Sequence, residues 1–224
     1  MGENKIRWLL KFAPKEAYID DLMSGCLYMN AAGYYHGMPG EQGDPLEASI
    51  APGVCAYCYT QLPIYCMYTI CEGEVVDDAV MIPGRMISEF GCENGWIGAV
   101  RYDRFARLID DCVDGDKGIF DHGPVSYGTP SIKLTREILQ GIPHNLFIKT
   151  PKCAYQREYR ILGANPVDFQ LKPKEGNPGR MIEVYGHEEL DLGRKLADFS
   201  WKVPVADLKT RRGNLALPLP ASLC

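Results

Sequence analysis

The sequence predicts an α+β protein with a mostly antiparallel or mixed sheet flanked by a few helices. Segments with strand periodicity outnumber helical ones, the two kinds follow one another in irregular order, and no internal repeat or low-complexity block interrupts them. The chain has 224 residues, a length typical of one large domain. We therefore expect residues 1–212 to form a single α+β domain and residues 213–224 to form a loose C-terminal tail.

The first elements are short. Apolar residues predict a strand over Ile6–Phe12, and residues spaced for one helical face predict a helix over Lys15–Ser24. Gly25 is a typical residue to end that helix. A second strand, Cys26–Asn30, then leads into Ala31–Pro45, where Gly and Pro predict a loop.

The middle of the chain carries the most apolar strand. Val54–Ile70 is rich in Tyr, Ile and Cys, which favours strands, and Gln61–Pro63 divides it in two. The second part, Ile64–Ile70, is apolar or aromatic on both faces, so we expect a central, covered strand. A short helix over Gly84–Phe90 and an apolar strand over Gly95–Arg101 follow.

The remaining elements are predicted on the same criteria. Helices are expected over Arg104–Val113 and Leu134–Gln140, and the proline-containing stretch Gly163–Gly179 is expected to be a long loop. Further strands are expected over Gly123–Gly128, Tyr155–Ile161, Met181–Tyr185 and Val203–Leu208.

The strand predicted over Tyr155–Ile161 contains the main candidate site. Its alternation places two sets of side chains on opposite faces: Tyr155, Arg157, Tyr159 and Ile161 toward the core, and Gln156, Glu158 and Arg160 on the other face. The polar row has two interpretations. It is either the solvated side of a half-exposed sheet, with Glu158 and Arg160 as an ordinary ion pair, or the lining of a cleft. In the second case Glu158 is a catalytic carboxylate and Gln156 an amide that orients the substrate.

Bulk composition narrows the function. The net charge of −5 argues against a protein that binds nucleic acid through a broad basic surface. No apolar run approaches the ~20 residues of a membrane-spanning helix, so we expect no membrane insertion. The nine cysteines follow an N-terminus without the pattern of a secretory signal. Reduced thiols and a cytoplasmic location are expected.

Two groups of residues raise the question of a metal. Cys55, Cys58, Cys66 and Cys71 could be zinc ligands, but the second pair lacks the usual spacing, and buried core cysteines are the favoured interpretation. Asp44 and Glu47 flank Pro45 at capping-box spacing, which favours a turn or helix cap. The alternative is a divalent-ion site shared with Glu158, as in a metal-dependent nuclease.

Several motifs together resemble an uncharacterised bacterial and phage family. They are the strand end Leu10-Lys11-Phe12, the strand Gly25-Cys26-Leu27-Tyr28, the loop Asp44-Pro45-Leu46-Glu47, the strand Ile64-Tyr65-Cys66-Met67-Tyr68, and Lys149 with the later Tyr155-Gln156-Arg157-Glu158-Tyr159-Arg160-Ile161. The resemblance spans roughly positions 8 to 162, and the last motif is the most specific.

The order of these motifs is also similar, more distantly, to the ADP-ribosyltransferase fold, which has a split sheet. That resemblance implies NAD as a substrate, Glu158 as the catalytic carboxylate and Gln156 two residues before it. It further implies that Lys11 and Arg160 contact the nucleotide and that Tyr28, or Tyr34 and Tyr35, stack on the nicotinamide. Lys11 departs from the pattern, which has Arg or His on this early strand. The segment beginning Ser126-Tyr127 is a candidate for the middle serine motif.

The sequence therefore leads to three functional hypotheses. The first is an ADP-ribosyltransferase-like protein of the phage or mobile-element type, which transfers ADP-ribose from NAD to an unknown protein or nucleic-acid acceptor. The second is a non-catalytic binding or inhibitor module of the same fold. The third is the metal-dependent nuclease described above.

Overall fold

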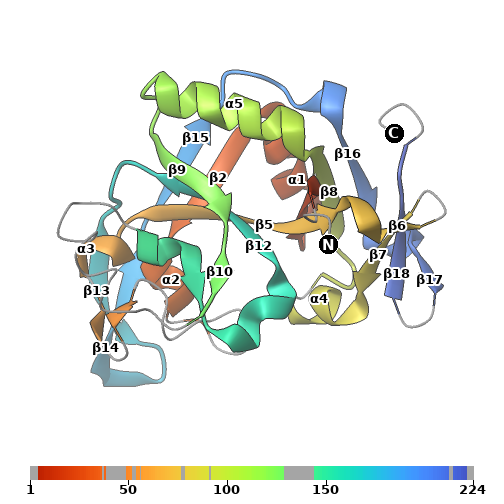
Figure 1. Ribbon diagram of the computed structural model, residues 1–224. Helices are drawn as coiled ribbons and strands as arrows, with labels where there is room; N and C mark the ends of the chain where they lie inside the picture. Colours follow the sequence, from red (N-terminus) through yellow and green to blue (C-terminus); the bar gives the residue numbers. More distant parts are fainter. Residues whose placement is uncertain are drawn as a thin grey trace.

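The computed structural model describes residues 5–36, 38, 49–51, 54–55, 57–76, 79–90, 92–128, 144–211 and 214–220 (Figure 1). An eight-stranded sheet forms the centre of the molecule. Its strands are β1 (Ile6–Ala13), β2 (Cys26–Ala31), β5 (Pro63–Cys71), β8 (Trp96–Arg101), β9 (Ile119–Pro124), β12 (Glu158–Gly163), β15 (His187–Asp191) and β16 (Ser200–Pro204). Every pairing in this sheet is antiparallel. The prediction of an α+β protein with mostly antiparallel sheets is confirmed.

Strand β5 organises the sheet because it has different partners along its length. One edge pairs with β12 over Ile64–Tyr68. The opposite edge pairs with β2 at Pro63 and Ile64 and with β1 from Tyr68 to Cys71. Both β1 and β2 therefore lie on the edge of β5 that faces away from β12, and neither pairs with the three residues between Ile64 and Tyr68. The sheet is split at this point: β8 and β16 continue from β1, and β15 continues from β2.

Two helices cover one face of the sheet. They are α1 (Glu16–Ser24) and α5 (Tyr102–Asp114), which bury apolar side chains against β1, β5 and β12. Helix α1 joins the two diverging strands β1 and β2, and it ends at Gly25, whose positive φ of 93° satisfies the left-handed C-cap geometry. On the other face, alternate residues of β1 and β5 pack on α4 (Gly84–Glu89) and on a second, four-stranded sheet.

The remaining elements are smaller. The four-stranded sheet comprises β6 (Val75–Val76), β7 (Ala79–Pro83), β17 (Lys209–Arg211) and β18 (Asn214–Pro218). Three two-stranded pairs are β3 (Ser49–Ala51) with β4 (Val54–Cys55), β10 (Ser126–Tyr127) with β11 (Ile148–Lys149), and β13 (Phe169–Lys174) with β14 (Asn177–Tyr185). The short helices are α2 (Ala32–His36), α3 (Tyr57–Thr60), η2 (Glu72–Glu74), η3 (His144–Phe147), η4 (Pro151–Gln156), η5 (Ala197–Phe199) and η6 (Val205–Asp207).

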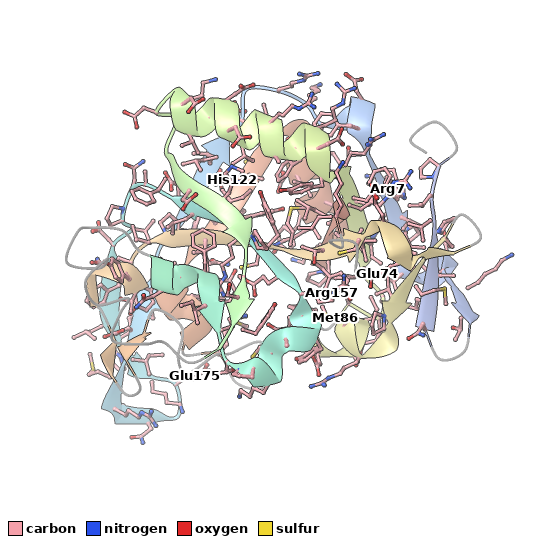
Figure 2. The ribbon with its side chains drawn as sticks, in the orientation of Figure 1. Arg7, Glu74, Met86, His122, Arg157 and Glu175 are labelled. Atoms are coloured by element: carbon pink, nitrogen blue, oxygen red, sulfur yellow. The ribbon has the colours of Figure 1, made fainter. Side chains whose placement is uncertain are left out.

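The late strand begins later than expected. Pro151 opens the 3-10 helix η4, which runs through Gln156, and Arg157 adopts a left-handed conformation with φ of 42° before β12 starts at Glu158. Gln156 is therefore not a strand residue. Arg157 does not point into the core but forms an ion pair with Glu74 (Figure 2). The expected alternation holds only from Glu158 onward.

Other expectations also need correction. A short helix, α2, lies in the expected loop after β2, and α3 replaces strand structure before Gln61. The stretch Gly163–Gly179, expected to be a long loop, contains most of the β13–β14 hairpin. The strands of this hairpin can contain prolines because neither strand has a second neighbouring strand among the described residues. The strand expected over Val203–Leu208 is mostly absent, because β16 (Ser200–Pro204) ends at Pro204 and η6 covers Val205–Asp207. The predicted helix over Leu134–Gln140 lies outside the described residues.

The C-terminal segment is not a loose tail over its described residues. Residues 214–218 form β18, which pairs with β7 on one edge and β17 on the other. Leu217 is fully buried beside Val80 and Ile82 of β7. The apolar residues Leu215, Leu217 and Leu219 thus supply part of the second core, and their burial favours an ordered strand here.

Candidate functional site

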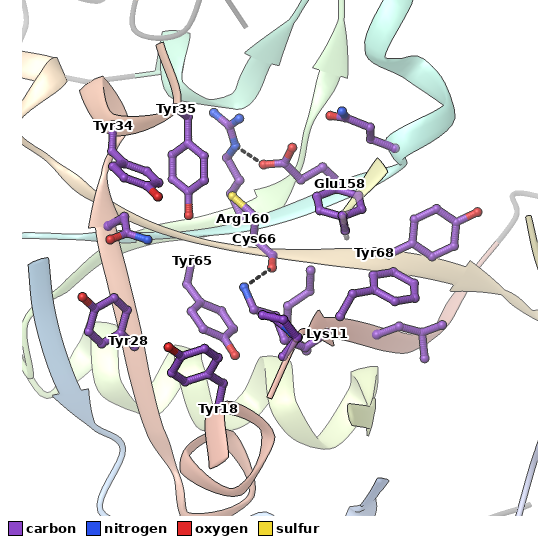
Figure 3. A pocket seen from close by; sticks show the side chains of 18 of the residues that line it. Lys11, Tyr18, Tyr28, Tyr34, Tyr35, Tyr65, Cys66, Tyr68, Glu158 and Arg160 are labelled. Atoms are coloured by element: carbon purple, nitrogen blue, oxygen red, sulfur yellow. Dashed lines mark hydrogen bonds and ion pairs between the residues drawn. The ribbon is translucent and has the colours of Figure 1, made fainter. Parts of the chain in front are cut away.

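The split of the main sheet opens into a cavity of about 630 Å³, called here the central cavity (Figure 3). It lies between the diverging strands β1 and β2, with β5 and β12 behind it. Seven residues that the sequence analysis assigned to catalysis or nucleotide binding line it, namely Lys11, Tyr28, Tyr34, Tyr35, Gln156, Glu158 and Arg160, whereas Ser126 of the candidate serine motif is not among the lining residues. The structure therefore brings together groups from the first 35 residues and from the late strand, as the cleft interpretation required.

Glu158 lies at the base of this cavity and is almost fully buried, with 7% of its surface exposed. Its Oε2 accepts a hydrogen bond of 2.8 Å from Lys149 Nζ, and its Oε1 accepts one from Arg160 Nε. Burial by itself raises the pKa of this carboxyl group, but the charges of Arg160 and Lys149 outweigh it and hold the pKa well below its ordinary value. Glu158 is therefore a carboxylate at neutral pH.

Lys149 joins Gln156 to Glu158. The Lys149 ammonium donates to Gln156 Oε1 at 2.9 Å as well as to Glu158, and it is itself buried. The two candidate side chains thus meet through a common cation, although Gln156 lies on η4 and not on the strand. Sequence reasoning did not assign Lys149 a role in the site. The sequence feature that could have indicated such a role is the position of Lys149, directly after the apolar pair Phe147-Ile148 and within the late motif.

Arg160 is held in place more firmly than a free anion-binding arginine would be. Its side chain is 1% exposed, and besides Glu158 it donates to the backbone carbonyl of Leu146. Arg160 therefore holds Oε1 of Glu158 while Lys149 holds Oε2, and Figure 3 shows the contact between Arg160 and Glu158. The backbone N–H of Glu158 donates to the hydroxyl of Tyr127 at 2.7 Å, so Tyr127 supports the main chain at this position.

Lys11 lies where β1 and β2 separate along the edge of β5. Its Nζ donates to the backbone carbonyl of Cys66 at 3.0 Å, and it lies 4.1 Å from the centre of the Tyr65 ring (Figure 3). Cys66 is the middle residue of the β5 segment that neither β1 nor β2 pairs with, so Lys11 replaces a strand as the partner of that carbonyl. Burial lowers the pKa of Lys11. This early-strand residue therefore has a structural function whether or not it also contacts a ligand.

Aromatic side chains form much of the rest of the wall. The rings that line the cavity are Phe12, Tyr18, Tyr28, Tyr34, Tyr35, Tyr65, Tyr68, Phe90, Tyr185 and His187. Tyr28 stacks on His187 with ring centres 4.3 Å apart, and Tyr34 meets Tyr35 edge to face at 5.4 Å. Tyr28 and Tyr34 are 44% and 45% exposed, so each presents a ring to an incoming molecule. Such walls suit a flat aromatic ligand.

The metal hypotheses gain no support among the residues that the structure describes. No group of three or more His, Cys, Asp or Glu side chains is placed to hold a metal ion in that part of the chain. Cys66 and Cys71 lie five positions apart on β5, so their side chains point to opposite faces and do not converge on one ion. The side chains of Cys55 and Cys58, and all of Asp44 and Glu47, lie outside the described residues.

The central cavity has aromatic walls and charged side chains at its base. Three cationic side chains, Lys11, Lys149 and Arg160, face two carboxylates, Glu158 and Asp21. An excess of positive charge under aromatic walls suits a ligand that combines a flat ring with phosphate or carboxylate groups. The Cys66 thiol also borders Glu158; burial raises its pKa to about 12, so it stays protonated and can donate to the carboxylate.

Comparisons with models of known protein families, with curated proteins and with solved structures found no match to this chain. Among the described residues, no helix is long and apolar enough to span a membrane.

Proposed function

We propose that the central cavity binds NAD and that the protein transfers ADP-ribose from NAD to an acceptor, with Glu158 beside the reacting ribose. The supporting observation is the convergence of Lys11, Tyr34, Tyr35 and Glu158, which are far apart in sequence, on one cavity at the split of the sheet. Cavities that bury small ligands occupy roughly 300–1,000 Å³, and about 630 Å³ falls within that range.

The chemistry requires a carboxylate that is ionised before the substrate arrives. When the bond between nicotinamide and ribose breaks, its electron pair leaves with the nicotinamide and positive charge develops on the ribose, as in glycoside hydrolysis. A fixed negative charge beside that sugar stabilises the transition state. The acceptor then bonds to the same ribose carbon and gives up a proton. Lys149 and Arg160 keep Glu158 in the charged form that this step uses.

The same ion pairs constrain how the site would work. In the structure each oxygen of Glu158 accepts from one cation, so a ribose hydroxyl must either share an oxygen with a cation, through the second lone pair of that oxygen, or displace a cation. Lys149 is the better candidate for displacement, because it also donates to a side chain, that of Gln156, whereas Arg160 is also held by the main-chain carbonyl of Leu146. A phosphate of the bound nucleotide would attract the Lys149 ammonium and leave one side of Glu158 open.

A second candidate function is a non-catalytic module that binds a small anionic ligand in the same cavity. The full pairing of Glu158 favours it, because a carboxylate neutralised by two buried cations has little remaining field to stabilise a cationic sugar. The use of Lys11 to hold the Cys66 carbonyl points in the same direction.

Two measurements separate these functions. The first follows release of nicotinamide and transfer of label from NAD in the presence of candidate proteins and nucleic acids. We expect Glu158→Gln to abolish turnover and Glu158→Asp to retain part of it, while Glu175→Gln, at an exposed turn far from the cavity, leaves it unchanged (Figure 2). Turnover that survives in Glu158→Gln contradicts the enzymatic proposal.

The second measurement is thermal stability with added NAD. A ligand at one hundred times its dissociation constant stabilises the folded state by about 2.7 kcal/mol. Tyr34→Ala removes a half-exposed wall ring and should reduce the shift with little loss of stability without ligand. A shift without turnover supports the binding module, and no shift at millimolar NAD contradicts NAD binding.

A further inference from the structure

A second cavity, of about 460 Å³, lies on the outer side of α5. It is lined by Arg101, Arg104, Arg107 and Arg194 together with Asp111 and Asp198, and is called here the arginine groove. Helix α5 packs by its other side on Tyr159 and Ile161, which are on the face of β12 opposite Glu158 and Arg160. The groove is therefore separate from the central cavity, and an inference about it does not depend on the proposed function.

The arginine groove carries an excess of positive charge, whereas the whole chain has a negative net charge. Four arginines face two aspartates here, whereas the protein carries a net charge of −5. Arg101 Nε is 3.1 Å from Asp103, and Arg104, which is 63% exposed, is 4.0 Å from the same residue. Within the described part of the chain, Arg107 and Arg194 form no ion pair. Pairing with neighbouring carboxylates therefore accounts for only two of the four arginines.

The spacing of the arginines suits a chain of phosphates. Arg101 is the N-cap of α5, and Arg104 and Arg107 follow it at three-residue intervals, so the three positions extend over about 9 Å along the helix axis. One nucleic-acid strand in a duplex advances about 3.4 Å along the axis per phosphate, so arginines spread over this length can contact neighbouring phosphates of one strand. Arg194, in the segment after β15, lines the same groove. The planar guanidinium group donates two parallel hydrogen bonds to phosphate oxygens.

We propose that the arginine groove binds the phosphodiester backbone of a nucleic-acid strand. The only aromatic residue of the groove, Phe199, is buried, so the described residues offer no ring on which bases could stack. Binding is therefore expected to be independent of base sequence and strongly dependent on salt.

The test is fluorescence anisotropy with labelled ten-nucleotide single strands of RNA and DNA of mixed sequence, titrated at several salt concentrations. The test variant is Arg104→Gln/Arg107→Gln/Arg194→Gln. Its matched control is Lys172→Gln/Lys174→Gln/Arg180→Gln, which removes the same number of positive charges from the exposed β13–β14 hairpin. Thermal melting of all three proteins verifies that they are folded.

We expect the wild type and the hairpin control to bind alike and the groove variant to lose at least about tenfold in affinity at low salt. The slope of log affinity against log salt should also fall by about 2, because each phosphate contact to a single strand contributes about 0.7. Absence of binding by the wild type, an equal loss in the control, or unchanged binding by the groove variant would overturn the proposal. A mononucleotide that binds as tightly as the ten-nucleotide strand would overturn it too.

Discussion

Replacing Glu158 by Gln tests the electrostatic structure of the site directly. The substitution keeps the size of the side chain but removes the charge that neutralises Lys149 and Arg160, both of which are buried. Removing one partner of a buried ion pair costs about 3–5 kcal/mol, because the remaining charge lacks both water and a counterion. In a chain of this size, 1 kcal/mol corresponds to about 2–4 °C in melting temperature. We expect the melting temperature of Glu158→Gln to fall by about 6–20 °C.

Urea unfolding of wild type, Glu158→Gln and the exposed control Glu175→Gln measures the difference, and the control should change stability by less than about 0.5 kcal/mol. The dependence on pH supplies a second check. Because the pKa of Glu158 in the folded protein lies below its ordinary value of 4.5, its stabilisation is present above about pH 4.5 and is lost as the pH falls further. The difference between wild type and Glu158→Gln should therefore shrink in acid. A cost below about 1 kcal/mol at neutral pH, the value of a surface pair, would refute the reasoning.

Three further predictions concern the structure around the site. Gly25→Ala should destabilise the protein by more than about 1 kcal/mol, because φ is 93° and the new Cβ would lie 2.2 Å from the Arg194 carbonyl oxygen; Gly176→Ala, with a positive φ but open space, should cost less in the same urea assay. Lys11→Met should cost about 1–3 kcal/mol by leaving the Cys66 carbonyl unpaired, and an unchanged unfolding midpoint would argue against the bridging role. The Cys66 thiol, with its pKa raised to about 12, should resist alkylation by iodoacetamide at pH 8 in the folded protein and react after denaturation, as peptide mapping by mass spectrometry would show.

The periodicity of apolar and polar residues correctly predicted the elements in which that periodicity is clear. The covered strand β5, the helix α1 with its glycine cap, and the shared face of Glu158 and Arg160 all follow from periodicity within a few residues. The strand expected over Tyr155–Ile161 was wrong at its start, because Pro151 favours a 3-10 turn there and Arg157 accepts a left-handed conformation. The strand predicted over Met181–Tyr185 lies within β14, but β13, β18 and the start of β14 were missed, because prolines favour loops although edge strands can contain them.

The arrangement of the site itself depends on strand pairing, which local periodicity does not encode. Lys11 and Tyr28 approach Glu158 only because β1 and β2 both pair with the same edge of β5 and then diverge. The motif order suggested that these residues belong together, but not that Lys11 would take the place of a missing strand at Cys66. Lys149 belonged to the late motif but was given no role in the site, because a single lysine after two apolar residues has no periodic signature.

Lys149 is the group on which the two functional hypotheses diverge. Lys149 donates to both Gln156 and Glu158, whereas Arg160 donates to Glu158 and to the backbone carbonyl of Leu146. If a ligand phosphate draws the Lys149 ammonium away, binding and exposure of the Glu158 carboxylate become a single event, and the empty cavity keeps its reactive group neutralised. If the ammonium stays, the only role of Glu158 is to position the cations Lys149 and Arg160 at the base of the cavity. The cavity can then bind an anion but cannot stabilise a cationic sugar.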